Sequence, residues 1–144
     1  MKVNYLNAIG FACLLSLSAC ASISMTRDLA LKTLSEKSAT DYFLYVDSPP
    51  TNPIAQAFVV AYLETSSTPT SDGLVELLRT NKNIGVAGSY DNITAATVKR
   101  AIKNFGTTVP FKAKLVMIGE PKNFVDLVDF ANTKGLTIKV LSPN

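Results

Sequence analysis

The stretch "NIGVAGSYDNITAATVKRAIKNFG" at residues 83–106, followed by "AKLVMIGEPKNFVDLVDFANTKGLTIKVL" at 113–141, decides the fold of this chain. Its short apolar runs at 83–89, 113–119 and 136–141 are typical of strands that are buried on both faces. About a dozen residues with helical periodicity separate each run from the next. Strands joined in this way need right-handed crossovers, so the stretch predicts a parallel sheet.

The two intervening segments predict amphipathic helices. Residues 91–106 end at Gly106, and residues 120–135 have Pro121 near the start and Gly135 at the end, which are the usual positions of these residues in helices. The residues expected to face the sheet are Ala95, Val98, Ile102 and Phe105 in the first helix, and Phe124, Leu127, Val128 and Ala131 in the second.

The segment before this stretch continues the same alternation. The run "YFLYV" at 42–46 predicts another strand buried on both faces. Asn52 and Pro53 then resemble an N-cap and a first helical residue, and they open "PIAQAFVVAYLET", where Ile54, Phe58 and Tyr62 recur at helical spacing. Because this segment is apolar nearly all round, a strand remains the alternative.

The rest of the segment between the predicted strands at 42–46 and 83–89 contains a loop and a short helix. "SSTPTS" at 66–71 predicts a loop, and Asp72 is expected to cap a short helix, "GLVELLRTN", with Leu74, Leu77 and Leu78 inward. The predicted fold class is therefore α/β, a small sandwich of about four mainly parallel strands covered by helices and forming a single domain over residues 41–144.

The first twenty residues have a different character. Lys2 precedes "AIGFACLLSL", an apolar run that is shorter than the roughly 20 residues needed to cross a bilayer and that matches the apolar region of an export signal. It ends in Leu17-Ser18-Ala19-Cys20. This motif resembles the lipobox of bacterial lipoproteins, in which a small-residue cleavage site ends in an obligatory cysteine.

The resemblance implies that Cys20 is alkylated by diacylglycerol, that the signal peptide 1–19 is removed, and that the new amine is acylated. The partner would then be a lipid bilayer, and no further anchor would be needed. Ala21, in place of Asp, is permissive for outer-membrane transport in enterobacterial-type lipoproteins, so the expected location is the outer membrane facing the periplasm. Residues 20–40 are expected to form a lipidated tether with a short helix capped by Thr26, and a helix docked on the domain or on a partner is the alternative.

Composition excludes several kinds of chemistry. The chain has no His, and its two cysteines are Cys13, in the leader, and Cys20. A body without His or Cys has no Ser-His-Asp or Cys-His device, no His-ligated zinc and no disulfide. The net charge of +3 and the absence of Trp argue against nucleic acid as a partner. We expect no metal and no other cofactor.

The candidate ligand site lies where the strands end. In open parallel sheets, ligands bind beyond the carboxyl ends of the strands, especially where the strand order reverses. The predicted strands deliver three carboxylates and a hydroxyl to this rim, together with further polar residues. The candidate ligand-binding residues are Asp47, Ser89, Asp91 and Glu120.

Two other features have a structural and a functional interpretation. The turn "GVAGSYDN" at 85–92 can cradle an anion or simply let Asp91 or Asn92 cap the next helix. A basic cluster can be a solvated helix surface or a footprint for phospholipid head groups, anionic glycans or an acidic partner. Its members are Lys99, Arg100, Lys103, Lys112 and Lys114.

The sequence thus favours a membrane-anchored envelope lipoprotein that acts as a non-enzymatic accessory, assembly or binding module with a protein partner in the envelope. The alternative is a lipid-anchored enzyme or small-ligand binder that uses the carboxylate-rich rim.

Overall fold

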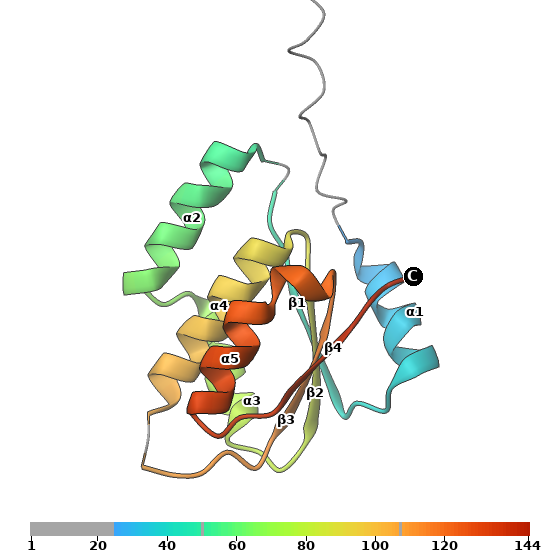
Figure 1. Cartoon of the computed structure of the whole chain (residues 1–144), viewed down its shortest axis with the longest axis vertical. Helices are drawn as coiled ribbons and strands as arrows, with labels where there is room; N and C mark the ends of the chain where they lie inside the picture. Colours follow the sequence, from blue (N-terminus) through green and yellow to red (C-terminus); the bar gives the residue numbers. More distant parts are fainter. Residues whose placement is uncertain (1–24, 50, 107) are drawn as a thin grey trace, which may run out of the picture.

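The computed structural model describes residues 25–49, 51–106 and 108–144, so the predicted signal peptide and Cys20 lie outside the described residues. The described part of the chain forms five α-helices, one short 3₁₀ helix and four strands (Figure 1). In chain order these are α1 (Arg27–Lys37), β1 (Tyr42–Val46), α2 (Pro53–Thr65), α3 (Pro69–Leu78), β2 (Asn83–Gly88), α4 (Asp91–Phe105), β3 (Lys114–Ile118), η1 (Pro121–Asn123), α5 (Val125–Thr133) and β4 (Ile138–Leu141).

The four strands form one parallel sheet in the order β1-β2-β3-β4, which confirms the predicted α/β class. Every crossover runs in the same direction along the sheet. With right-handed crossovers, this order places all the connecting helices on one face. Figure 1 shows that arrangement, with α1 alone on the other face.

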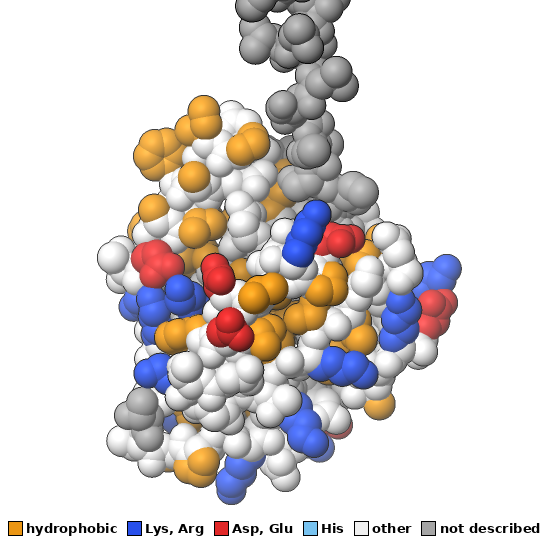
Figure 2. Space-filling model, viewed as in Figure 1, with side chains coloured by type: hydrophobic (Ala, Val, Ile, Leu, Met, Phe, Trp, Pro, Cys, Tyr) orange, Lys and Arg blue, Asp and Glu red, His pale blue; other side chains and the backbone are white. Residues whose placement is uncertain are grey.

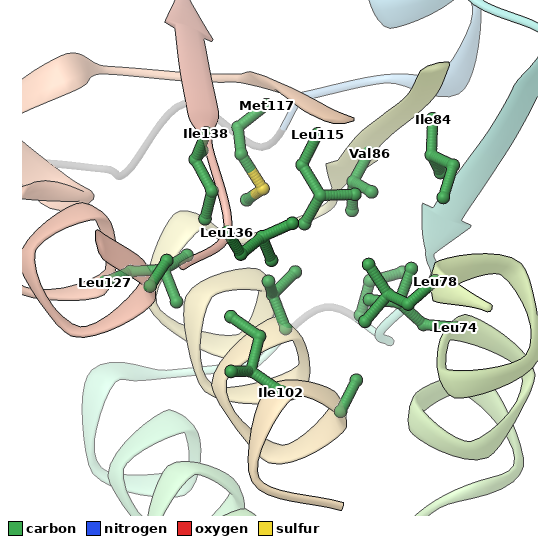
Figure 3. Packing of buried hydrophobic residues seen from close by; sticks show 14 of the residues in the cluster. Leu74, Leu78, Ile84, Val86, Ile102, Leu115, Met117, Leu127, Leu136 and Ile138 are labelled. Carbon is green, nitrogen blue, oxygen red and sulfur yellow. The ribbon is translucent and has the colours of Figure 1, made fainter. Parts of the chain in front are cut away.

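The strands alternate their side chains between two cores. Ile84 and Val86 of β2 point to the connecting helices (Figure 3), whereas Ala87 points to α1. The larger core joins all four connecting helices to the sheet. It includes Leu63 of α2, Leu74 and Leu78 of α3, Ile102 of α4, and Leu127 of α5.

The smaller core docks α1 on the opposite face of the sheet. Ala30 and Leu34 of α1 are buried against Ala87 and Val116, while Leu29 points outward. Gly85 permits this close approach, because a Cβ at that position would lie 2.6 Å from a methyl carbon of Leu34. Residues 25–37 therefore form the docked helix and not a tether, and this part of the chain packs on the sheet ahead of residue 41.

Several local predictions are confirmed and others are wrong. Gly106 follows α4, and Gly135 adopts φ +79° just after α5. The cap of α3 is Thr68 and not Asp72, since Thr68 and Ser71 form a reciprocal capping box that starts the helix within the predicted loop. The β1 strand is only partly buried because it lies at an edge of the sheet.

The helix predicted from 53 onward forms with Asn52 as its N-cap, so the strand alternative is wrong. Its spaced apolar residues Ile54, Phe58 and Tyr62 are nevertheless exposed. None of the described helices is both long and apolar enough to cross a membrane.

Candidate functional site

The strand order removes the crevice that a rim site would normally use. Ligands of open α/β sheets bind where neighbouring crossovers diverge to opposite faces. Here all the crossovers between β1 and β4 proceed in one direction, so the strand order never reverses. The predicted site residues lie at the expected edge of the sheet, but no switch point gathers them.

Ser89 and Asp47 come together at the ends of β2 and β1. Ser89 is buried, and its hydroxyl lies 3.5 Å from an Asp47 carboxylate oxygen and 3.4 Å from the Tyr45 hydroxyl. It also accepts a hydrogen bond of 3.1 Å from the backbone N–H of Ser48. The hydroxyl of Ser89 therefore ties the end of β2 to the segment leaving β1.

Asp91 and Glu120 meet at a second point along the same edge. The carboxylate of Asp91 accepts hydrogen bonds from the backbone N–H of Glu120 at 3.1 Å and from the amide of Asn123 at 2.7 Å. Gly119 allows this approach, because a Cβ there would lie 2.5 Å from a carboxylate oxygen of Asp91. Glu120 contributes its backbone while its side chain is exposed, so the two carboxylates do not form an acid–base pair here.

The turn at 85–92 directs part of its hydrogen bonding into the fold, but the helix cap that the structural interpretation expected is wrong. The N–H of Ser89 donates to the carbonyl of Val46, and the N–H of Thr94 donates to the carbonyl of Tyr90. Neither Asp91 nor Asn92 caps α4, because the N-cap is Tyr90, which makes no side-chain capping bond. The N–H groups that the anion hypothesis needed are thus partly committed to the fold.

One open groove lies beside the Asp47 and Ser89 pair. Its volume is about 620 Å³, within the usual range for small-ligand sites. Arg27 and Asp47 supply opposite charges at its wall, so it suits a small polar or zwitterionic molecule better than a metal. Its lining also includes Met25, Thr26, Phe43, Leu44, Tyr45, Ser48 and Ser89.

Asp91 and Glu120 do not line this groove. Within the described ranges, no set of three or more Asp, Glu, His or Cys residues is placed to hold a metal ion. Asp47 and Ser89 therefore meet beside the groove, whereas Asp91 and Glu120 meet at another point of the rim.

The structure separates the basic cluster into two groups, and the first group contacts Glu64 of α2. Lys103 and Lys99 approach the carboxylate of Glu64 at 2.8 and 3.8 Å, and Arg100 donates to the Glu64 carbonyl at 3.1 Å. The hydrogen bond from Lys103 and the charge of Lys99 hold the pKa of Glu64 below its ordinary value of 4.5. These three cations attach the C-terminal end of α2 to α4. Positive charges near the C-terminal end of a helix also interact favourably with its dipole.

Lys112 and Lys114 lie elsewhere and are exposed. Sequence reasoning missed Tyr45 and Arg27 as residues of the rim, and it placed Tyr90 there without a role. Tyr90 accepts a hydrogen bond of 3.0 Å from the backbone N–H of Thr51 and so fixes the loop that leads to α2. No sequence motif marks these residues, because their roles arise from contacts between distant segments.

The chain matches no known family model, and no similar curated protein or solved structure was found. Its function must therefore be argued from its own residues.

Proposed function

We propose that this chain is a lipid-anchored protein of the bacterial cell envelope whose α/β unit is a non-enzymatic accessory, assembly or binding module. The observation that carries the proposal is the position of Leu17-Ser18-Ala19-Cys20 a few residues ahead of Met25 and α1, which pack on the sheet. Residues 20–24 span at most about 17 Å when fully extended. An acylated Cys20 would thus hold the unit against the bilayer.

The chemistry of the rim supports a binding role over catalysis. The chain has no His, and its only cysteines are Cys13 and Cys20. Asp91 is engaged in holding two turns together, and the hydroxyl of Ser89 links two chain segments through Asp47 and the backbone of Ser48. These structural contacts of the rim residues support a binding or assembly role.

The acylation step has a direct test in the two cysteines. Cells expressing the wild type, Cys13→Ser or Cys20→Ser are fed labelled palmitate, and carbonate-washed membranes are examined for the protein. We expect label and membrane retention in the wild type and in Cys13→Ser, and neither in Cys20→Ser. Unlabelled wild-type protein, or label that persists in Cys20→Ser, would contradict the proposal.

The module role predicts a protein partner in the envelope, facing the periplasm at the outer membrane. Affinity capture of the acylated protein from gently solubilised envelopes should return a stoichiometric partner. A bound small molecule without any partner would instead favour the second candidate function.

That second candidate is a small-ligand binder, and the open groove beside Asp47 favours it. Native mass spectrometry of the protein from envelopes would detect a retained ligand. Asp47→Ala should release such a ligand, whereas Glu120→Ala should not, because Glu120 does not line the groove. Equal retention by both variants would place any ligand elsewhere.

A further inference from the structure

The outward side of α2 carries four of the nine large hydrophobic side chains that are exposed among the described residues. Phe58 is 73% exposed, Ile54 71%, Tyr62 56% and Val59 40%. Their spacing puts them on one side of the helix. Figure 2 shows hydrophobic side chains gathered over the projecting helix that Figure 1 labels α2.

The attachment of α2 to the domain does not need this side. Its buried residues are Gln56 and Leu63, on the side facing the core. Its C-terminal end is held through Glu64 by Lys103, Lys99 and Arg100 of α4. Because the helix is already secured, an exposed apolar patch on it marks a contact site rather than a packing element.

The charge pattern of α2 suits lipid as the occupant. Residues 53–63 contain no charged side chain, and the first one, Glu64, is paired with cations of α4. No charge would therefore have to enter the low-dielectric region when the outward side is covered by lipid. Tyr62 adds an aromatic ring with a hydroxyl, the kind of side chain that is enriched where a bilayer meets water.

The chain outside the described residues points to the same occupant. Met25 lines the groove together with Asp47 and Ser48, and α2 begins shortly after Ser48 in the chain. The start of α1 and the N-terminal end of α2 therefore lie at the same end of the molecule, as Figure 1 shows. Residues 20–24, with their reach of about 17 Å, leave from that end.

We propose that the outward side of α2 is a second membrane contact, lying at the bilayer interface with Ile54, Phe58, Val59 and Tyr62 toward the lipid. This inference rests on the proposed function for the anchor that brings the bilayer near. Once the chain is tethered, a weak contact suffices, because the second binding event becomes intramolecular. The contact holds the α/β unit in one orientation on the membrane.

The absence of Trp from the chain gives a clean experiment. The experiment uses the chain from Cys20 onward, which is the mature form that the proposed function predicts and which has Cys20 as its only thiol. This chain is coupled through Cys20 to maleimide-bearing lipid in phosphatidylethanolamine–phosphatidylglycerol vesicles with brominated acyl chains. Phe58→Trp reports on α2, and Val109→Trp is the matched control, since Val109 is 53% exposed and belongs to the loop before β3.

An interfacial helix buries its apolar side about 5–10 Å into the headgroup and acyl boundary. The Phe58→Trp variant should therefore lose much more of its tryptophan emission to the brominated lipid than the Val109→Trp variant. The Val109→Trp variant should lose little. Circular dichroism of both variants checks that the fold is retained.

Other outcomes overturn the inference. Equal quenching in both variants would mean that the domain has no fixed orientation. If the Phe58→Trp emission is unquenched and typical of a solvent-exposed ring, a protein partner becomes the favoured occupant of this surface. If the emission shifts to the blue as the protein density on the vesicles rises, the occupant is a second copy of this chain. Coupling to lipid is chemical here, so a negative result leaves acylation of Cys20 in cells untouched, and the palmitate experiment decides that separately.

Discussion

Helices α4 and α2 lie side by side, yet they use their apolar residues in opposite ways. The α4 helix has charged residues on one side and buries eight of its fifteen residues beneath its neighbours. The α2 helix is apolar nearly all round, buries two of its thirteen residues and exposes Ile54, Phe58 and Tyr62. A helix that is apolar all round is ordinarily a buried one. The peripheral position of α2 therefore indicates a surface that serves something other than folding.

The comparison is tested most strongly by the same substitution in both helices. Ile102 of α4 is 2% exposed, so Ile102→Ala removes a packed side chain and should lower the free energy of unfolding by about 2–5 kcal/mol. Ile54→Ala in α2 should change it by less than about 0.5 kcal/mol. Urea unfolding followed by circular dichroism measures both values, and similar losses in the two variants would contradict the burial difference.

A third helix sharpens the comparison, because α1 is short and polar yet docked. Leu34 is 3% exposed between α1 and the sheet. Leu34→Ala should cost about 2–4 kcal/mol in the free energy of unfolding. Its control is Leu31→Ala, since Leu31 is on the same helix and 42% exposed. A negligible loss at Leu34 would mean that α1 is a tether after all.

These helices also show what the sequence could predict. The strands and helices from residue 83 onward follow from apolar runs punctuated by Gly106, Pro121 and Gly135, because such local signals need no knowledge of distant contacts. The docking of α1 depends on Gly85 of β2, which leaves room for Leu34 of α1 to pack directly on the sheet. Periodicity alone cannot reveal that contact, so it could not separate the docked helix from a tether.

The candidate site, too, could be predicted only in part from the sequence. The placement of Asp47, Ser89, Asp91 and Glu120 at one edge followed from where the strands end, and that edge is where they lie. Which of them face each other depends on strand order and on turn geometry. Asp91 turns to the backbone of Glu120 through the space that Gly119 leaves, a contact that no residue pattern signals.

The structural role of Asp91 predicts an intermediate effect. Asp91→Ala removes the acceptor of two hydrogen bonds, to the Glu120 backbone and to Asn123, and should cost about 1–3 kcal/mol of stability. Glu120→Ala is the matched control, because only the backbone of Glu120 takes part, and it should be nearly neutral. Thermal unfolding of both variants measures the difference. A larger loss of stability in Glu120→Ala than in Asp91→Ala would contradict the structural role of Asp91.

The ionic attachment of α2 to α4 predicts a smaller, pH-dependent effect. The lowered pKa of Glu64 means that its stabilising contribution is present above its ordinary value of 4.5 and is lost as the pH falls through the lower pKa of the folded state. The side chain of Glu64 is 45% exposed, so solvent screening limits Glu64→Gln to about 0.2–1 kcal/mol at neutral pH.

The measurement is the free energy of unfolding of the wild type and Glu64→Gln at several pH values, where the difference should vanish in acid. Glu76→Gln is the control, because its pair with Arg79 is longer, at 3.6 Å, and more exposed. A difference that grows as the pH falls would contradict the sign of the shift.

The smallest expected effect on stability belongs to the residue with the largest proposed role at the membrane. Phe58→Ser replaces a ring that is 73% exposed and should change the free energy of unfolding by no more than about 0.5 kcal/mol. Phe105→Ser in α4 is its counterpart, because that ring is buried and stacks on Phe111 with centroids 4.2 Å apart. A loss at Phe58 near that at Phe105 would mean that the ring packs on another part of the chain in solution, which would remove the surface on which the membrane contact depends. An unchanged free energy of unfolding in Phe58→Ser would show that folding does not require this aromatic side chain. That result is expected if the side chain serves contact with a bilayer.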